Sequence, residues 1–186
     1  MSVVIVDGYN VIHAWPRLKT LITTAGGEDA RRALVAELAE YAAVRNTAVT
    51  VVFDGPRRAA SAAEVIDGVT VVFSGRSGSA DHLIERLVYE AARAGEARDV
   101  MVATSDRLQR DLVRAMGVAT IDAAGFEAEV AAAGREIGAL TERSREQSRF
   151  SRRVEQSLPP DVLQRLEQLR RGRGVDADGG EGDGRG

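Results

Sequence analysis

The 186-residue sequence contains no cysteine, only 4% aromatic residues and little net charge, which is −3 at pH 7. The lack of cysteine excludes a disulfide scaffold, a thiolate metal site and a cysteine nucleophile. The small net charge does not by itself indicate a polyanionic partner. We expect neither a membrane-spanning helix, because no run of about 18 apolar residues occurs, nor a signal peptide. These absences favour a soluble cytoplasmic protein without a membrane partner.

Short apolar runs alternate with segments of helical spacing. The runs are typical of strands buried on both faces of a sheet, and they are Val3–Val6, Val49–Phe53, Val69–Phe73, Val100–Ala103 and Val118–Ile121. Apolar residues three or four positions apart predict helices over Ala30–Arg45, Ala80–Ala94 and Arg107–Met116. Before Ala48, the Trp15-Pro16 pair predicts a break between a short first helix and a longer second one. This alternation predicts an α/β fold with a doubly wound, mainly parallel sheet and flanking helices.

The C-terminal part of the chain has a different composition. From Ala123 the pattern is helical and alanine-rich, and it becomes strongly charged from Thr141. Residues 172–186 contain seven glycines and four acidic residues, which predicts disorder. We therefore expect an α/β domain over residues 1–135, a charged helical extension over 136–171 and a disordered tail over 172–186.

Aspartates stand where the predicted strands end. Asp7 and Asp54 directly follow the first two strands, and Asp106 follows the fourth. Asp81 opens the helix after the third strand, with Glu85 one helical turn later on the same face. Because the carboxyl ends of parallel strands share one edge of a sheet, where ligands bind, these acids are predicted to converge. Taken singly, each aspartate also fits a structural role as a helix cap or turn residue.

Clustered carboxylates repel one another unless a cation lies among them. Mg²⁺ or Mn²⁺ suits such a set, because both prefer oxygen ligands. Zinc does not suit it, since the chain has only two histidines and no cysteine. A carboxylate-bound metal can activate water and neutralise charge on a phosphodiester. The pattern therefore favours hydrolysis at an acidic metal site.

Other catalytic motifs are absent. Gly75-x-x-Gly78 lacks the Gly-Lys-Ser/Thr ending of a P-loop, and no G-x-S-x-G nucleophile elbow follows a strand. A phospho-acceptor receiver module would need a lysine after the last strand, where this chain has Asp122. It would also need an acidic pair after the first strand, where this chain has Asp7-Gly8. None of these three classes fits.

The opening block Asp7-Gly8-Tyr9-Asn10-Val11-Ile12, followed by Trp15-Pro16-x-Leu18, resembles the NYN domain of YacP-like proteins, a branch of the PIN-like nucleases. Four later blocks agree with that family in order and spacing: Val51–Asp54, Val72-Phe73, Ser79-Ala80-Asp81-x-x-Ile84-Glu85 and Ala103-Thr104-Ser105-Asp106. The resemblance covers about Val3 to Val130. It implies a PIN-like fold and a Mg²⁺- or Mn²⁺-dependent RNA endonuclease, with mRNA as the expected substrate and the ribosome as a partner in some bacterial relatives.

Carried over by position, the resemblance implies that Asp7, Asp81 and Asp106 are the catalytic, metal-binding acids. It implies two further acids, Asp54 and Glu85, which either bind the metal or equally well support its ligands without touching it. The supporting polar residues are Asn10, Thr104 and Ser105.

Arginines on the predicted edge loops and on the neighbouring helix are expected to contact RNA, and they are Arg57, Arg58, Arg76, Arg107 and Arg110. A second basic stretch runs from Arg143 to Arg153, where an ordinary solvated helix face is an equal alternative. Two other functions remain open. One is a non-catalytic RNA- or ribosome-binding module on the same fold, and the other is a toxin-like nuclease.

Overall fold

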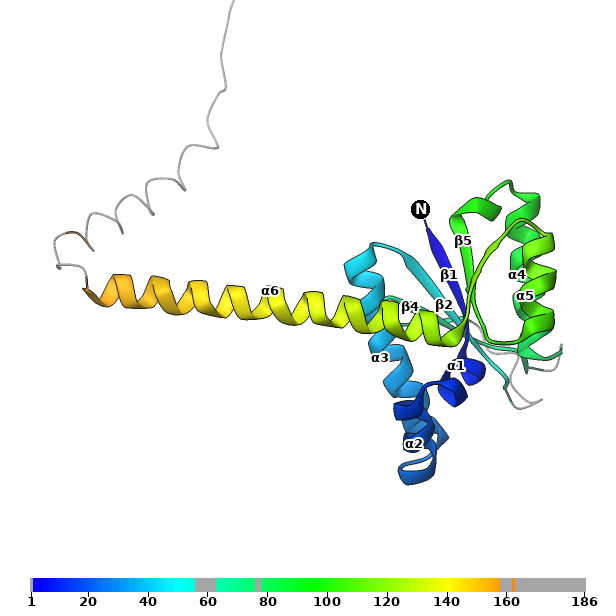
Figure 1. Cartoon of the computed structure of the whole chain (residues 1–186), viewed down its shortest axis with the longest axis horizontal. Coiled ribbons are helices and arrows are strands. Elements are labelled where there is room, and N and C mark those ends of the chain that lie inside the picture. The colour runs from blue at the N-terminus through cyan, green and yellow to red at the C-terminus, as the bar shows by residue number, and fades with distance from the viewer. Residues whose placement is uncertain (1, 56–62, 76–77, 158–161, 163–186) are drawn as a thin grey trace, which may run out of the picture. The chain divides into compact units, whose positions relative to one another are not determined.

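The computed structural model describes residues 2–55, 63–75, 78–157 and 162. The chain forms two compact units, Met1–Gly138 and Ala139–Gly186. The first unit contains a six-stranded sheet with helices on both faces (Figure 1). None of the described helices combines the length and the apolar character needed to span a lipid bilayer.

The strands follow the order β3-β4-β2-β1-β5-β6 across the sheet. All neighbouring pairs are parallel except β3 with β4. The strand bounds are β1 Val3–Asp7, β2 Ala48–Phe53, β3 Glu64–Ile66, β4 Val69–Phe73, β5 Val100–Ala103 and β6 Ala119–Ile121. The chain moves outward from β1 in one direction through β2 and β4, and in the other through β5 and β6. The point where the order reverses therefore lies between β1 and β5, and ligands bind at such a point in doubly wound sheets.

The described residues form six α-helices, which are α1 Gly8–Ala14, α2 Pro16–Thr24, α3 Gly27–Arg45, α4 Ala80–Arg93, α5 Arg107–Ala115 and α6 Ala123–Ser157. Adjacent strand residues face opposite layers, as the pleat requires. Val51 packs in a buried cluster with α1, α2, α3 and the start of α6, whereas Val52 packs in a second cluster with α4 and α5. The mixed α/β fold with a mainly parallel sheet is thus confirmed.

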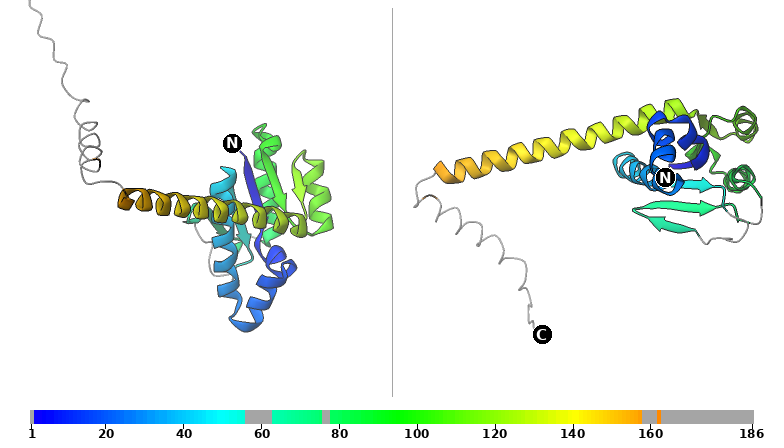
Figure 2. Two further views of the ribbon diagram at one scale, coloured as in Figure 1. Left: turned by 60° about the vertical axis from the view of Figure 1, so that its left-hand side comes forward. Right: turned by 90° about the horizontal axis from the view of Figure 1, so that it is seen from below.

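Two features differ from the expectations. Strand β3 was not predicted, and it forms an antiparallel hairpin with β4 at the edge of the sheet (Figure 2, right). The turn is Asp67-Gly68, with φ angles of 50° and 85°, the left-handed geometry of a type I′ hairpin turn. The region between β1 and β2 contains three helices instead of two, because the helix after Pro16 ends at Thr24 and Gly26 adopts a φ of 104°.

The second unit begins within α6. From Ala139 to Phe150 its residues are exposed, including the large apolar side chains of Leu140 and Phe150. The predicted disordered tail and, apart from Val162, the last part of the predicted helical extension from residue 158 onward lie outside the described residues.

Candidate acidic site

Asp7 occupies the junction between β1 and α1. It is the last residue of the strand and the N-cap of the helix, and its Oδ1 accepts a hydrogen bond from the Asn10 backbone N–H at 3.1 Å. The abrupt junction requires Gly8, because a Cβ atom there would overlap the ring of Phe53. The sharp turn leaves the Asp7 side chain only 7% exposed.

The surroundings of Asp7 disfavour its charge. The pKa of Asp7 is raised from 3.8 to about 6, mainly by burial, while the hydrogen bond from the Asn10 N–H acts in the opposite direction. The negative charges of three other strand-end aspartates, Asp81, Asp54 and Asp106, contribute to the rise. The carboxylates therefore lie close enough to interact, although they come from four separate segments of the chain.

Asp54 connects the end of β2 to the start of α4. Its Oδ1 accepts from the backbone N–H of Ala80 at 2.6 Å and from the hydroxyl of Ser74 at 3.2 Å. Ser79 is the N-cap residue of α4 by position, but its side chain makes no capping hydrogen bond. Asp54 thus caps this helix from a distant segment and determines where the helix begins.

Asp81 and Asp106 lie in the first turn of α4 and at the N-cap of α5, respectively. Gln109 contacts both: its backbone N–H donates to Asp106 Oδ1 at 3.0 Å, and its side-chain Nε2 donates to Asp81 Oδ1 at 2.8 Å. Burial raises the pKa of Asp81, and the charges of Asp106 and Asp54 raise it further, while His82 lowers it.

The four aspartates share one bonding pattern. In each of them Oδ1 accepts a hydrogen bond from a protein N–H group. The Oδ2 atom of each accepts no hydrogen bond from a described residue. Glu85 is not among the acids whose charge raises the pKa of Asp7 or Asp81. Within the described part of the chain, no three Asp, Glu or His side chains are grouped so as to hold a metal ion by themselves. A bound cation would therefore use few of these carboxylates directly and would complete its shell with water or phosphate oxygens.

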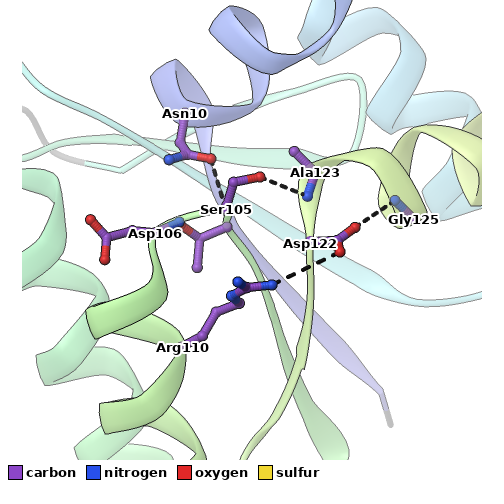
Figure 3. A network of polar contacts seen from close by, with 8 residues as sticks. Asn10, Ser105, Asp106, Arg110, Asp122, Ala123 and Gly125 are labelled. Carbon is purple, nitrogen blue, oxygen red and sulfur yellow. Dashed lines mark hydrogen bonds and ion pairs between the residues drawn. The ribbon is translucent and has the colours of Figure 1, made fainter.

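A polar network holds the loop between β5 and α5 (Figure 3). Asn10 Oδ1 accepts from the Ser105 N–H at 2.7 Å, and Ser105 Oγ accepts from the Ala123 N–H at 3.1 Å. The fully buried Thr104 accepts the Asp106 N–H on its Oγ1 at 3.1 Å. The carboxylate of Asp106 is directed away from the Ser105–Ala123 contact (Figure 3). The three residues that the resemblance implied as supporting thus hold the Asp106 loop against α1 and α6.

The arginines expected to contact RNA fall into different environments. Arg107 is exposed in the first turn of α5. Arg110 is only 23% exposed and pairs with the Asp122 carboxylate at 3.9 Å, as Figure 3 shows. The loop arginines Arg57, Arg58 and Arg76 lie outside the described residues. In the second unit, the described arginines Arg143, Arg145, Arg149 and Arg153 are exposed.

Gln109 and Ser74 are neighbours of the acids that the sequence pattern does not predict. The Asp106-x-x-Gln109 spacing was visible, but it predicts only a helix capping box. Ser74 follows β4 directly, at the same edge as the acids, and that position was its only signal. Both contacts join segments far apart in the sequence, so no local pattern reveals them.

Comparisons with known proteins identify the family and agree with the fold. The model of the YacP-like NYN domain matches residues 4–171. The YacP protein of Bacillus subtilis strain 168 is 32% identical over 173 residues, covering 92% of this chain and 98% of the relative. The crystal structure of Rae1 (YacP) from Bacillus subtilis is similar with a TM-score of 0.64 and 32% identity, covering 96% of this chain and 99% of that one. A mutant of the same protein gives 0.65, with 29% identity over 91% of this chain and 99% of that one. Because these matches extend over most of its length, the chain belongs to the YacP-like NYN family.

Proposed function

We propose that this protein is an endoribonuclease that hydrolyses phosphodiester bonds with Mg²⁺ or Mn²⁺ held at the acidic site. The observation that carries the proposal is the shared bonding pattern of Asp7, Asp54, Asp81 and Asp106, in which Oδ1 accepts a hydrogen bond and Oδ2 accepts none from a described residue. The family supports an RNA-related function, because YacP-like NYN domains belong to the PIN-like nucleases. RNA, and mRNA in particular, is the proposed substrate, with the ribosome as a proposed partner.

The available donor atoms fit a hard divalent cation. They are carboxylate oxygens, which Mg²⁺ and Mn²⁺ prefer. His82 adjoins Asp81, but its Nδ1 lies 3.0 Å from the Ser79 hydroxyl and is engaged there. The Oδ2 atoms of Asp7, Asp81 and Asp106 are the proposed ligands, some of them through a bound water, because no three described acids are grouped to hold a cation by themselves. Asp54 has a positioning role in this proposal, because its Oδ1 caps α4.

The cation would supply Lewis acidity for the attack of water on the phosphodiester. The chain's own residues would orient the substrate. Asn10 is held by Ser105 through its Oδ1, so its Nδ2 remains to donate to a phosphate oxygen. Arg107, exposed beside Asp106, would bind a neighbouring phosphate. Asp7 has to lose its proton to bind a cation, so its pKa of about 6 predicts weak metal binding below that pH.

The test is Mn²⁺ titration by calorimetry on wild type, Asp7→Asn and Asp111→Asn. Asp111 lies exposed on α5 and is not among the four interacting acids, so it controls for the loss of one negative charge. We expect micromolar-to-millimolar binding that Asp7→Asn loses and Asp111→Asn keeps. Cleavage of an oligoribonucleotide in Mn²⁺ should follow the same order, and full cleavage by Asp7→Asn would refute the role of Asp7.

A non-catalytic RNA-binding module is the second candidate. It is favoured by one observation, that no three described acidic or histidine side chains are grouped to hold a metal alone. It predicts RNA association that needs no divalent cation and that Asp7→Asn leaves unchanged. Gel-shift measurements in EDTA and in Mn²⁺ distinguish the two candidates.

A further inference from the structure

Gln109 donates to two carboxylates that come from two different helices. Its backbone N–H binds Asp106 Oδ1 at 3.0 Å, and its side-chain Nε2 binds Asp81 Oδ1 at 2.8 Å. The side chain is 3% exposed. Among the described residues, no other hydrogen-bonds to both of these acids. Gln109 therefore connects α4 to α5 at the point where the acids meet.

The position of Gln109 would ordinarily give it a different partner. It is the third residue of α5, and a glutamine there usually turns back to accept the N–H of the N-cap residue. Here the hydroxyl of Thr104 accepts the Asp106 N–H at 3.1 Å. Because Thr104 takes over that part of the capping box, the Gln109 amide is free to reach Asp81.

The orientation of the Gln109 amide group carries an energetic cost at its oxygen atom. An ionised carboxylate accepts but cannot donate, so Asp81 requires the NH₂ group to face it. Gln109 Oε1 is then buried without a hydrogen-bond partner in the described part of the chain. A buried acceptor without a partner destabilises a fold. An apolar side chain of similar length would avoid that cost. The amide group therefore contributes through its hydrogen bond to Asp81.

We propose that Gln109 is a positioning residue of the acidic site, which holds the Asp81 and Asp106 carboxylates together through their Oδ1 atoms and leaves both Oδ2 atoms to a divalent cation. This inference rests on the proposed metal-dependent function. The two N–H groups of Gln109 offset part of the repulsion between the carboxylates. The pair is thus assembled before a cation arrives, and binding does not have to bring the helices together.

The test measures Mn²⁺ affinity by calorimetry on the full-length protein. Gln109→Met keeps the length and apolar packing of the side chain but removes the donor. Val113→Ala is the matched control, because Val113 is fully buried one turn later on α5 and lies in the core cluster beneath the helix. We expect Gln109→Met to weaken Mn²⁺ binding by about tenfold or more. Val113→Ala should lower the melting temperature and leave the affinity within about twofold, because it removes packing and no contact to an acid.

A second variant distinguishes loss of the contact to Asp81 from a folding defect. Gln109→Asn is polar, but its amide is one methylene shorter and cannot make the contact to Asp81, so it should weaken Mn²⁺ binding in the same direction. In cleavage assays, the deficit in kcat of both variants should become smaller as the Mn²⁺ concentration is raised. A purely structural defect would leave the deficit unchanged. Wild-type affinity in either folded variant overturns this inference alone. No Mn²⁺ binding by the wild-type protein overturns the proposed function as well.

Discussion

Replacing Asp7 by asparagine should stabilise the metal-free protein, and by an amount that depends on pH. The pKa of Asp7 is about 6 in the folded protein and 3.8 in the absence of its surroundings, which is the value for the unfolded chain. The folded protein thus holds this proton more tightly than the unfolded chain does. The stability that the protonated carboxyl group contributes is fully present below about pH 4 and is lost as the pH rises through about 6.

The size of the effect follows from the same two values. Each pH unit between them corresponds to about 1.4 kcal/mol, so ionised Asp7 costs the folded state about 3 kcal/mol above pH 7. Asparagine carries no charge, and its side-chain oxygen can still accept the Asn10 N–H, because asparagine and aspartate are equally good N-caps. At pH 4 the two proteins should be equally stable. At pH 7.5 Asp7→Asn should be the more stable by up to about 3 kcal/mol, or about 6–12 °C in melting temperature.

Urea unfolding of both proteins in EDTA, at intervals from pH 4 to pH 8, measures this difference. Asp111→Asn serves as the control and should track the wild type at every pH. Adding Mn²⁺ at pH 7.5 should raise the stability of the wild type and close the gap, since a ligand stabilises the state that binds it. A difference between Asp7→Asn and wild type that stays constant across the range would refute the argument, and so would one that grows toward low pH.

Three further predictions test the surroundings of the acids. Asp54→Ala removes the cap of α4 and should cost about 1–2 kcal/mol in urea unfolding, whereas a change of under 0.5 kcal/mol would show that the cap contributes little. Gly8→Ala forces a Cβ into an aromatic ring and should cost about 1–3 kcal/mol, while Gly27→Ala, with open space around it, should be neutral or stabilising by melting temperature. Asn10→Ala removes the acceptor of the Ser105 N–H. It should reduce cleavage of RNA by about 10²–10³-fold, which is what loss of one oriented transition-state donor costs, and undiminished cleavage would contradict the role proposed for its amide.

Much of the sheet could be predicted because its strands carry a strong signal. Val3–Val6 and Val49–Phe53 are buried on both faces, so almost every residue in them is apolar. Strand β3 has no such run, because its three residues are exposed at the edge. Only the Asp67-Gly68 dipeptide, which suits a left-handed hairpin turn, indicated that a hairpin forms there.

The convergence of the acids could be predicted for a different reason. Parallel strands end at the same edge of the sheet, so residues that directly follow neighbouring strands lie close together at that edge. The partners of each oxygen could not be predicted in this way. The contacts of Asp54 with Ala80 and of Asp81 with Gln109 depend on how two helices begin and on the direction of single side chains. Those details arise only when the segments pack.

The dispersal of the acids along the chain has a consequence for protein synthesis. Asp7 and Asp106 come together only after β5 has been inserted beside β1, because the loop after β5 carries Asp106. A nascent chain that ends before Asp106 therefore carries an incomplete set of carboxylates, and a local opening of α5 in the finished protein disperses them again. Under the proposed function, hydrolysis at this edge would begin only when the fold is complete, and unfinished or partly unfolded copies would not cleave RNA.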